Sequence, residues 1–228
     1  MAIPGTAFLA LWNDRSEGRD DYEAWHSREH IPERLTIPGI LAGRRYVDGK
    51  GPLPPYFTFY PLESLDVLSS AEYVDLVNRP SSWSRSMRPA LSRMYRQGCQ
   101  TTFSVGAGVA GYLVAALLGR TAEQAGTPEV GMIARDPAIS ALHIGTVREI
   151  APLVFAEMAN HDLPPSDAIM LVELFDKDAF PASVGRLDDL IERAGYRRLL
   201  DWTMYSLAFA LDKDEVGSTL PPTPDDCS

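Results

Sequence analysis

The order of apolar strands and amphipathic helices along the chain is the feature that most restricts its fold. Short apolar, β-branched or aromatic runs ended by Gly, Pro or Asn-Asp predict strands at residues 6–12, 40–47, 56–62 and 99–106. Apolar side chains at helical spacing predict helices over residues 22–34 and 64–80. The first half of the chain therefore has the order β-α-β-β-α-β.

That order is the ferredoxin-like plait, in which an antiparallel sheet packs against two helices and leaves its other face bare. A bare apolar face needs a cover, and the second half of the chain supplies a copy with strands at 111–120, 138–150, 166–175 and 199–211 and a helix at 186–196. We therefore predict an α+β protein in which two tandem ferredoxin-like repeats form an α+β barrel.

The predicted domains follow from this duplication. Residues 1–108 form the first repeat and carry a histidine-rich helix, and residues 109–213 form the second, degenerate repeat. Residues 120–137 hold two glycines and two prolines, so they cannot form a helix as long as the one in the first repeat. Residues 214–228 combine proline with acidic residues and predict a flexible tail.

Composition excludes several classes of partner. The chain has 228 residues, 45% of them hydrophobic, and a net charge of −10, which disfavours nucleic acid and anionic membrane surfaces. Cys99 and Cys227 are too few for a disulfide framework or a cysteine zinc motif. The N-terminal segment lacks a basic leader, and the longest apolar run, residues 105–119, is too short to span a membrane. We expect a cytoplasmic protein without membrane or nucleic-acid partners.

The segment YEAWHSREHIPER, residues 22–34, is the strongest chemical motif. His26 and His30 are four residues apart and so lie on one face of a helix. With Glu29 they also match H-x-x-E-H, a zinc pattern that needs a third protein ligand and a large two-lobed cleft. Because such a short pattern occurs often by chance, we expect no metal here.

The same residues resemble a known superfamily. The chain resembles the EthD-like branch of the dimeric α+β barrel superfamily in three consecutive stretches. They are Trp25, His26, Glu29 and His30 with the following Ile-Pro, then Ile37-Pro38-Gly39-Ile40, and then the strand end Arg44-Arg45-Tyr46. The resemblance implies a pocket between sheet and helices. Its members include cofactor-free isomerases, small decarboxylases and dehydratases, polyketide cyclases, anthrone-type monooxygenases and haem enzymes made of two fused plaits.

An acid/base site needs one imidazole that faces the barrel cavity and a partner that sets its tautomer. The resemblance places the histidine of the family at His30, with His26 one turn earlier as partner or second proton carrier. Glu29 or Glu33 could orient an imidazole. The alternative is a solvated helix face, with Trp25 buried and both histidines near the surface.

Candidate substrate-binding residues lie on the predicted strands. Arg44 and Arg45 point to opposite faces of their strand, so one of them should reach the cavity and bind a carboxylate, or both cap the strand at the surface. Tyr46 shares the face of Arg44. Tyr60 shares a face with Tyr56 and Thr58 and could stabilise negative charge.

Two further groups of residues are candidates outside that strand pair. Trp83 and Arg88 lie in residues 80–91, which could form a lid over the cavity mouth, although packing is the simpler role for Trp83. His143, in the second repeat, invites a haem interpretation, but the expected basic residues are missing there. We therefore expect no cofactor.

The leading functional hypothesis is a lyase or isomerase without cofactor, acting on a small aromatic or lactone-type acid, with His30 moving the proton. The alternatives are a cofactor-independent monooxygenase of phenolic substrates, a haem-binding fused barrel and a non-catalytic binding module. A tandem chain completes its own barrel, although it could still form a homodimer through an edge strand.

Overall fold

The computed structural model of the chain describes residues 3–15, 21–121, 136–150 and 162–216. Eight antiparallel strands form a closed barrel in the order β5-β7-β6-β4-β1-β3-β2-β9 and back to β5, and β8 adds to β5. The strands are β1 (Ala7–Arg15), β2 (Ala42–Lys50), β3 (Tyr56–Leu62), β4 (Leu91–Gly106), β5 (Tyr112–Arg120), β6 (Ile139–Arg148), β7 (Ala168–Leu174), β8 (Tyr196–Arg198) and β9 (Thr203–Asp212).

Two strands join the halves of the barrel. The 16-residue β4 pairs with β1 along its first part and with β6 along its second part. In the same way β9 pairs with β2 and with β5. The single chain therefore closes its own α+β barrel, which confirms the predicted fold class. The exact repeat boundaries stay a prediction.

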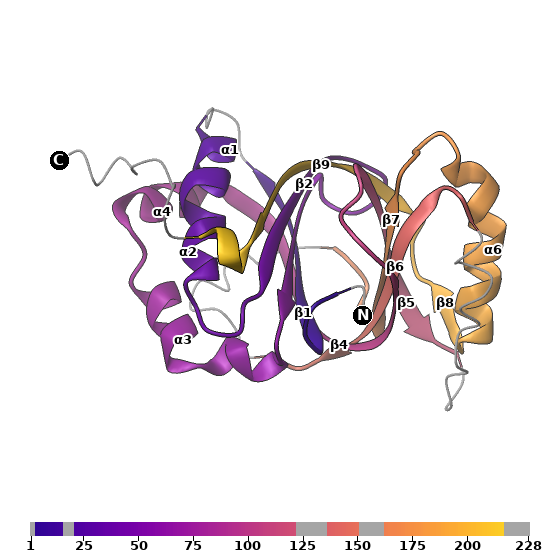
Figure 1. Cartoon of the computed structure of the whole chain (residues 1–228), viewed down its shortest axis with the longest axis horizontal. Coiled ribbons are helices and arrows are strands. Elements are labelled where there is room, and N and C mark those ends of the chain that lie inside the picture. Colours follow the sequence, from indigo (N-terminus) through magenta and orange to yellow (C-terminus); the bar gives the residue numbers. More distant parts are fainter. Residues whose placement is uncertain (1–2, 16–20, 122–135, 151–161, 217–228) are drawn as a thin grey trace.

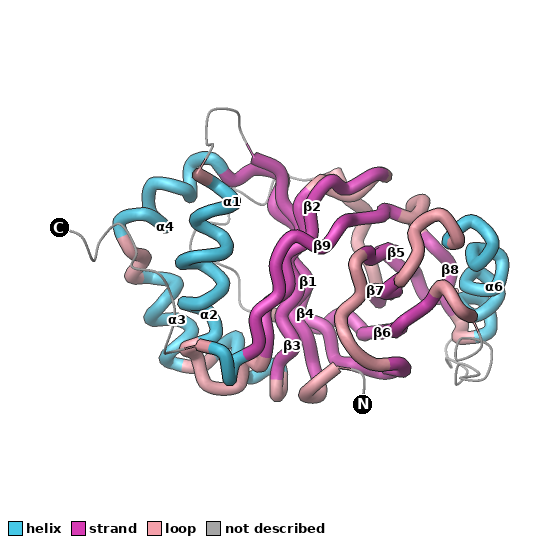
Figure 2. The backbone as a smooth tube through the Cα atoms, turned by 45° about the horizontal axis from the view of Figure 1, so that its top comes forward, coloured by secondary structure: helices cyan, strands magenta, loops and turns pink. Residues whose placement is uncertain are grey.

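The helices gather at two opposite ends of the molecule (Figure 1). At one end lie α1 (Tyr22–Trp25), the π-helical turn η1 (His26–His30), α2 (Ile31–Leu35), η2 (Leu65–Ser69), α3 (Ala71–Asn78), α4 (Ser82–Met87) and η3 (Arg88–Ala90). At the other end α6 (Phe180–Arg193) covers the second half (Figure 1). The turn η5 (Lys213–Glu215) follows β9 and lies beside α2, where Lys213 donates to the carbonyls of Leu35 and Ile37. Figure 2 shows the same separation from a view turned by 45°. Within the described residues no helix is long and apolar enough to cross a membrane.

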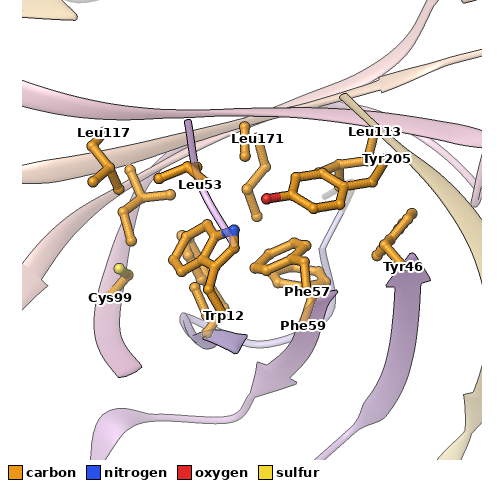
Figure 3. Packing of buried hydrophobic residues seen from close by; sticks show 14 of the residues in the cluster. Trp12, Tyr46, Leu53, Phe57, Phe59, Cys99, Leu113, Leu117, Leu171 and Tyr205 are labelled. Atoms are coloured by element: carbon orange, nitrogen blue, oxygen red, sulfur yellow. The ribbon is translucent and has the colours of Figure 1, made fainter. Parts of the chain in front are cut away.

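Alternate residues of each strand build separate cores. On β1, Phe8, Ala10 and Trp12 face the barrel interior, where Trp12 stacks on Phe57 with ring centroids 4.6 Å apart. Figure 3 shows this interior filled by aromatic and aliphatic side chains. Leu9 points the other way, toward the helices. His26 and His30 do not reach this packed interior but lie on the helix side of the sheet.

Several element boundaries differ from the sequence prediction. The first helix ends at Leu35, one residue beyond the prediction, and begins as α1 at Tyr22 as predicted. The segment 64–80 divides into η2 and α3 because Ser70 is extended and its side chain accepts a hydrogen bond from the Tyr73 amide. Residues 82–90 form α4 and η3, and β4 begins at Leu91 rather than Cys99. Most of residues 120–137, together with His161 and residues 217–228, lie outside the described residues.

Candidate active site between the first sheet and its helices

A pocket lies between the outer face of β1, β3 and β4 and the helices of the first half. Its volume is about 60 Å³, enough for roughly four to six water molecules. We call it the helix pocket. Its lining comprises Leu9, Leu11, Asn13, Trp25, His26, His30, Glu33, Arg34, Tyr60, Tyr73, Leu76, Val77, Pro80, Ser84, Arg88, Leu91, Met94 and Arg96.

The π-helical turn that carries both histidines follows from Pro32. In an α-helix the amide of residue 32 would donate to the carbonyl of Arg28, but proline has no N–H and its ring crowds that carbonyl. The chain widens instead, and the Ile31 amide donates to the carbonyl of His26, five residues back. Turns of this kind are frequent at functional sites.

His26 and His30 lie side by side in the helix pocket. Their ring centroids are 4.9 Å apart in an edge-on arrangement, and the Trp25 ring lies 4.5 Å from that of His30. Burial lowers the pKa of both imidazoles well below 6.5, and the nearby arginines lower it further. Both rings are therefore neutral at pH 7 and able to accept a proton.

Unpaired polar atoms concentrate in this pocket. The Oδ1 atom of Asn13, the Nδ1 atoms of His26 and His30, the hydroxyl of Tyr60 and Nη1 of Arg34 are buried without a hydrogen-bonding partner from the described protein. An unpaired buried polar group costs about 1–3 kcal/mol. Such a group in a native protein calls for a ligand, for water or for a functional reason.

Cationic side chains are part of the lining of the pocket. Arg34, Arg88 and Arg96 line it together with one carboxylate, Glu33, whose Oε2 atom is 3.7 Å from Nη1 of Arg34. Arg96 donates a 3.1 Å hydrogen bond to the hydroxyl of Tyr73. Burial raises the pKa of Glu33, and Arg34 opposes that effect. The pocket is therefore suited to an anion.

Glu29 has a different role from the one predicted. Its Oε1 atom accepts hydrogen bonds from the Ser81 hydroxyl at 2.5 Å, the Ser84 hydroxyl at 2.8 Å and the Ser84 amide at 3.1 Å. The Ser84 hydroxyl also accepts a 3.1 Å hydrogen bond from the Trp25 indole. Glu29 thus holds the N-terminus of α4 against the histidine helix.

Arg44 and Arg45 point to opposite faces, as predicted, but neither lines the helix pocket. Arg44 lies in the barrel interior and donates a 2.7 Å hydrogen bond to Glu173, and Tyr46 packs in the same interior core. Arg45 is buried on the helix side, where it donates to Glu23 and Thr58. Both guanidiniums are thus held by partners of their own.

The remaining predicted residues divide between the pocket and its surroundings. Trp25, Tyr60 and Arg88 line the helix pocket, as do both histidines. Trp83 lies outside the lining, where its indole donates a 2.9 Å hydrogen bond to Asp21 and its ring packs near Tyr22 and Trp25. This contact agrees with the packing role for Trp83.

Neither a zinc site nor a haem site at His143 fits the described residues. No three His, Cys, Asp or Glu side chains in the described ranges come together as a metal-binding group, and Glu29 is engaged with α4. His143 is 1% exposed inside the barrel, with Nδ1 3.0 Å from the Ser104 hydroxyl and Nε2 3.8 Å from Glu173. Core side chains enclose this ring, which leaves no face for a macrocycle.

Sequence reasoning missed five polar residues of the pocket. Asn13, Arg34, Tyr73, Ser84 and Arg96 come from β1, α2, α3, α4 and β4, so only the tertiary fold brings them together. One signal was present for Arg34: it continues the four-residue spacing of His26 and His30 on the same helix face.

Comparison with known proteins supports the fold. No family model and no curated protein sequence matches the chain. A solved anthrone oxidase-like protein superposes with a TM-score of 0.59 at 11% identity, over 94% of this chain and 96% of the other. A candidate monooxygenase from Lactobacillus acidophilus gives 0.53 at 8% identity, covering 91% and 97%. A haem-binding protein from Thermus thermophilus gives 0.51 at 12%, covering 92% and 93%.

At these identities the likeness shows the fold alone, an α+β barrel that closes within one chain. Membership of the dimeric α+β barrel superfamily, and of its EthD-like branch, stays a prediction.

Proposed function

We propose that the protein is a cofactor-independent oxygenase that deprotonates a phenolic aromatic substrate in the helix pocket. The observation that carries this proposal is the pair of adjacent neutral imidazoles with unpaired nitrogens, in the same pocket as the unpaired hydroxyl of Tyr60. The fold similarity to an anthrone oxidase-like protein and a candidate monooxygenase supports this alternative over the lyase or isomerase hypothesis.

The reaction balances with oxygen as the only co-substrate. His30, assisted by His26, accepts the phenolic proton, and the resulting anion carries negative charge onto the ring carbon para to the oxygen. That carbon transfers one electron to O₂, and the two radicals combine as a peroxide. Loss of water converts the former C–H carbon into a carbonyl, so that one oxygen atom enters the product and the other leaves as water.

The surrounding side chains would favour the anion. Tyr60 keeps its proton because burial raises its pKa above the ordinary value of 10, so its hydroxyl can donate to a developing phenolate. The positive arginines lower the energy of that phenolate and offset the weak basicity of the imidazoles. Glu29 acts at a distance, as a positioning residue that holds α4 and Ser84 against Trp25.

Oxygen uptake tests the proposal. With the single-ring phenols 2-methylphenol and 3-methylphenol as probes, whose ring carbon para to the hydroxyl carries hydrogen, we expect uptake of one O₂ per product and, under ¹⁸O₂, one labelled oxygen in the product. His30→Asn should lower kcat by about 10²-fold to 10⁴-fold, whereas Arg85→Gln, on α4 outside the pocket lining, should leave it unchanged.

The same experiment separates the alternatives. Turnover without oxygen uptake would support the lyase or isomerase hypothesis, which shares the proton-transfer step. Binding without turnover of any probe would support the binding module. Full activity of His30→Asn would show that the base is assigned wrongly.

A further inference from the structure

Asn13 is a fully buried polar residue of the helix pocket that the proposed reaction does not use. It follows Leu9 and Leu11 at alternate positions of β1, and all three side chains line the pocket together with His26 and Tyr60. An amide group in a row of leucines lowers stability unless its polar atoms find partners. The partners of Asn13 are therefore informative about what the pocket binds.

The hydrogen bonds of the Asn13 amide group fix its orientation. Nδ2 donates a 2.8 Å hydrogen bond to the carbonyl of Asp14 and a 2.6 Å hydrogen bond to the hydroxyl of Tyr22. Because a carbonyl oxygen can only accept, the atom beside it must be the nitrogen, and the amide cannot be turned over. Both protons of Nδ2 are thus used, whereas Oδ1 is buried without a hydrogen-bonding partner in the described protein.

Tyr22 is itself held in place. Its side chain is fully buried, and its ring lies edge-on to that of His26 with centroids 5.1 Å apart. The guanidinium carbon of Arg45 lies 5.1 Å from the centroid of the same ring. Tyr22 therefore contacts both Asn13 and His26, and it connects the orientation of the amide to the helix that carries the histidines.

We propose that Oδ1 of Asn13 accepts a hydrogen bond from a second hydroxyl group of the substrate, so that the preferred substrate is a benzene-1,3-diol. This inference rests on the proposed function, because it takes the helix pocket as the active site. It adds Asn13 as a specificity residue and Tyr22 as a positioning residue.

The chemistry of Oδ1 is the first argument. Nδ1 of a neutral imidazole can donate or accept according to the tautomer, and a tyrosine hydroxyl can do both, but an amide oxygen can only accept. In the proposed reaction the phenolic proton goes to His30 and is not available to Asn13. A ligand that displaces water from the pocket without donating to Oδ1 leaves a buried acceptor unpaired, which weakens binding. A second hydroxyl group supplies the missing donor.

The register of the sheet is the second argument. Tyr60, which donates to the developing phenolate in the proposed reaction, is paired with Leu9, and Asn13 lies four residues farther along β1, or about 13 Å. This spacing favours two hydroxyl groups that are well separated on the ring. The reaction also needs a hydrogen on the carbon para to the first hydroxyl group. The meta position is therefore the most distant one available to the second hydroxyl group.

Binding measured under nitrogen tests this inference without turnover, because oxygen is the co-substrate of the proposed reaction. The pocket volume of about 60 Å³ is well below that of sites for drug-sized ligands, so the probes have a single ring. Isothermal titration of the full chain compares 1,3-dihydroxybenzene with 3-methylphenol and 3-methoxyphenol, whose meta groups cannot donate. The diol should bind about threefold to tenfold more tightly than either, as expected for one neutral hydrogen bond. It should also bind more tightly than 1,2-dihydroxybenzene.

Variants locate the hydrogen bond. Asn13→Leu has a side chain of similar size that cannot accept, so the preference for the diol over 3-methylphenol should disappear. Tyr22→Phe removes one of the two acceptors of Nδ2 and should reduce the preference. Arg85→Gln, outside the pocket lining, should keep it. Circular dichroism checks the fold of each variant, and the wild-type comparison of probes decides the inference even where a variant does not fold.

The outcomes separate this inference from the proposed function. Equal affinity of the wild type for 1,3-dihydroxybenzene and 3-methylphenol, or a preference that survives in folded Asn13→Leu, would overturn the inference and leave the oxygen-uptake result standing. Tighter binding of 1,2-dihydroxybenzene than of the 1,3-isomer would overturn the meta assignment. His30→Asn should lose turnover of 3-methylphenol but keep the preference for the diol. The expected preference without oxygen uptake by any probe would support the inference and count against the oxygenase reaction alone.

Discussion

Replacement of Glu173 by glutamine should destabilise the barrel strongly. The Glu173 side chain is fully buried, and its two oxygens accept a 2.7 Å hydrogen bond from Arg44 and a 2.8 Å hydrogen bond from the Ala110 amide. Glutamine keeps the shape and can still accept from Ala110, but it leaves the Arg44 charge without a counterion. Breaking a buried ion pair in this way costs about 3–5 kcal/mol, a large part of the 5–15 kcal/mol that is typical of a folded protein.

Urea unfolding at pH 7 measures this effect. The Glu173→Gln variant should show a lower midpoint with an unchanged m-value. The double variant Arg44→Met/Glu173→Gln should recover much of the loss, because it removes the uncompensated charge. Asp75→Asn, which breaks the exposed pair with Arg79, serves as the control and should leave the midpoint unchanged. A Glu173→Gln midpoint equal to the wild type would refute the reasoning.

Three further predictions concern the pocket and its histidines. Burial lowers the pKa of all three described histidines below 6.5, so at low pH the unfolded chain binds protons that the folded chain does not. The free energy of unfolding should therefore fall as pH drops below about 6.5, by up to about 1.4 kcal/mol per pH unit for each histidine, which urea titrations at pH 7, 6 and 5 measure. Tyr60→Phe should lower kcat, while the free energy of unfolding should stay the same or rise by up to about 1 kcal/mol, because the change removes an unpaired buried hydroxyl. A clearly lower Tm would mean that Tyr60 has a structural partner. Glu29→Ala should lower the free energy of unfolding by about 1–3 kcal/mol and speed hydrogen exchange in α4, since the hydroxyl and amide donors of Ser81 and Ser84 lose their acceptor. The control variant Glu72→Ala, at an exposed position in α3, should change neither the free energy of unfolding nor the exchange rate.

The fold was predictable because it rests on local patterns. Alternation along β1 and β3 and the apolar runs of β5 and β7 specify which side chains enter each core. A β-α-β-β-α-β order followed by a second set of four strands and one helix predicts a shared barrel. Element ends were less predictable. The π-helical turn at residues 26–30 was not predicted from the helical spacing, and the start of β4 at Leu91 depends on pairing with Arg15, a contact between residues far apart in the sequence.

The site was predictable only in part, for the same physical reason. His26 and His30 are adjacent in space because one helix carries them, so spacing alone brought them together. Glu29 lies within the same motif, yet its partners Ser81 and Ser84 come from a helix that the sequence suggested only as a possible lid. No local pattern reports such a long-range hydrogen bond.

Open space distinguishes the two polar regions of this molecule. Inside the barrel, Arg44 and Glu173 form a buried ion pair, although Nε of Arg44 and Nε2 of His143 have no hydrogen-bonding partner in the described protein. In the helix pocket, His30, Tyr60 and Arg34 also carry buried polar atoms without such a partner. Core side chains fill the barrel interior, whereas the helix pocket has room for several water molecules or a ligand. Unpaired polar groups beside an open volume are the reason to place function outside the barrel wall.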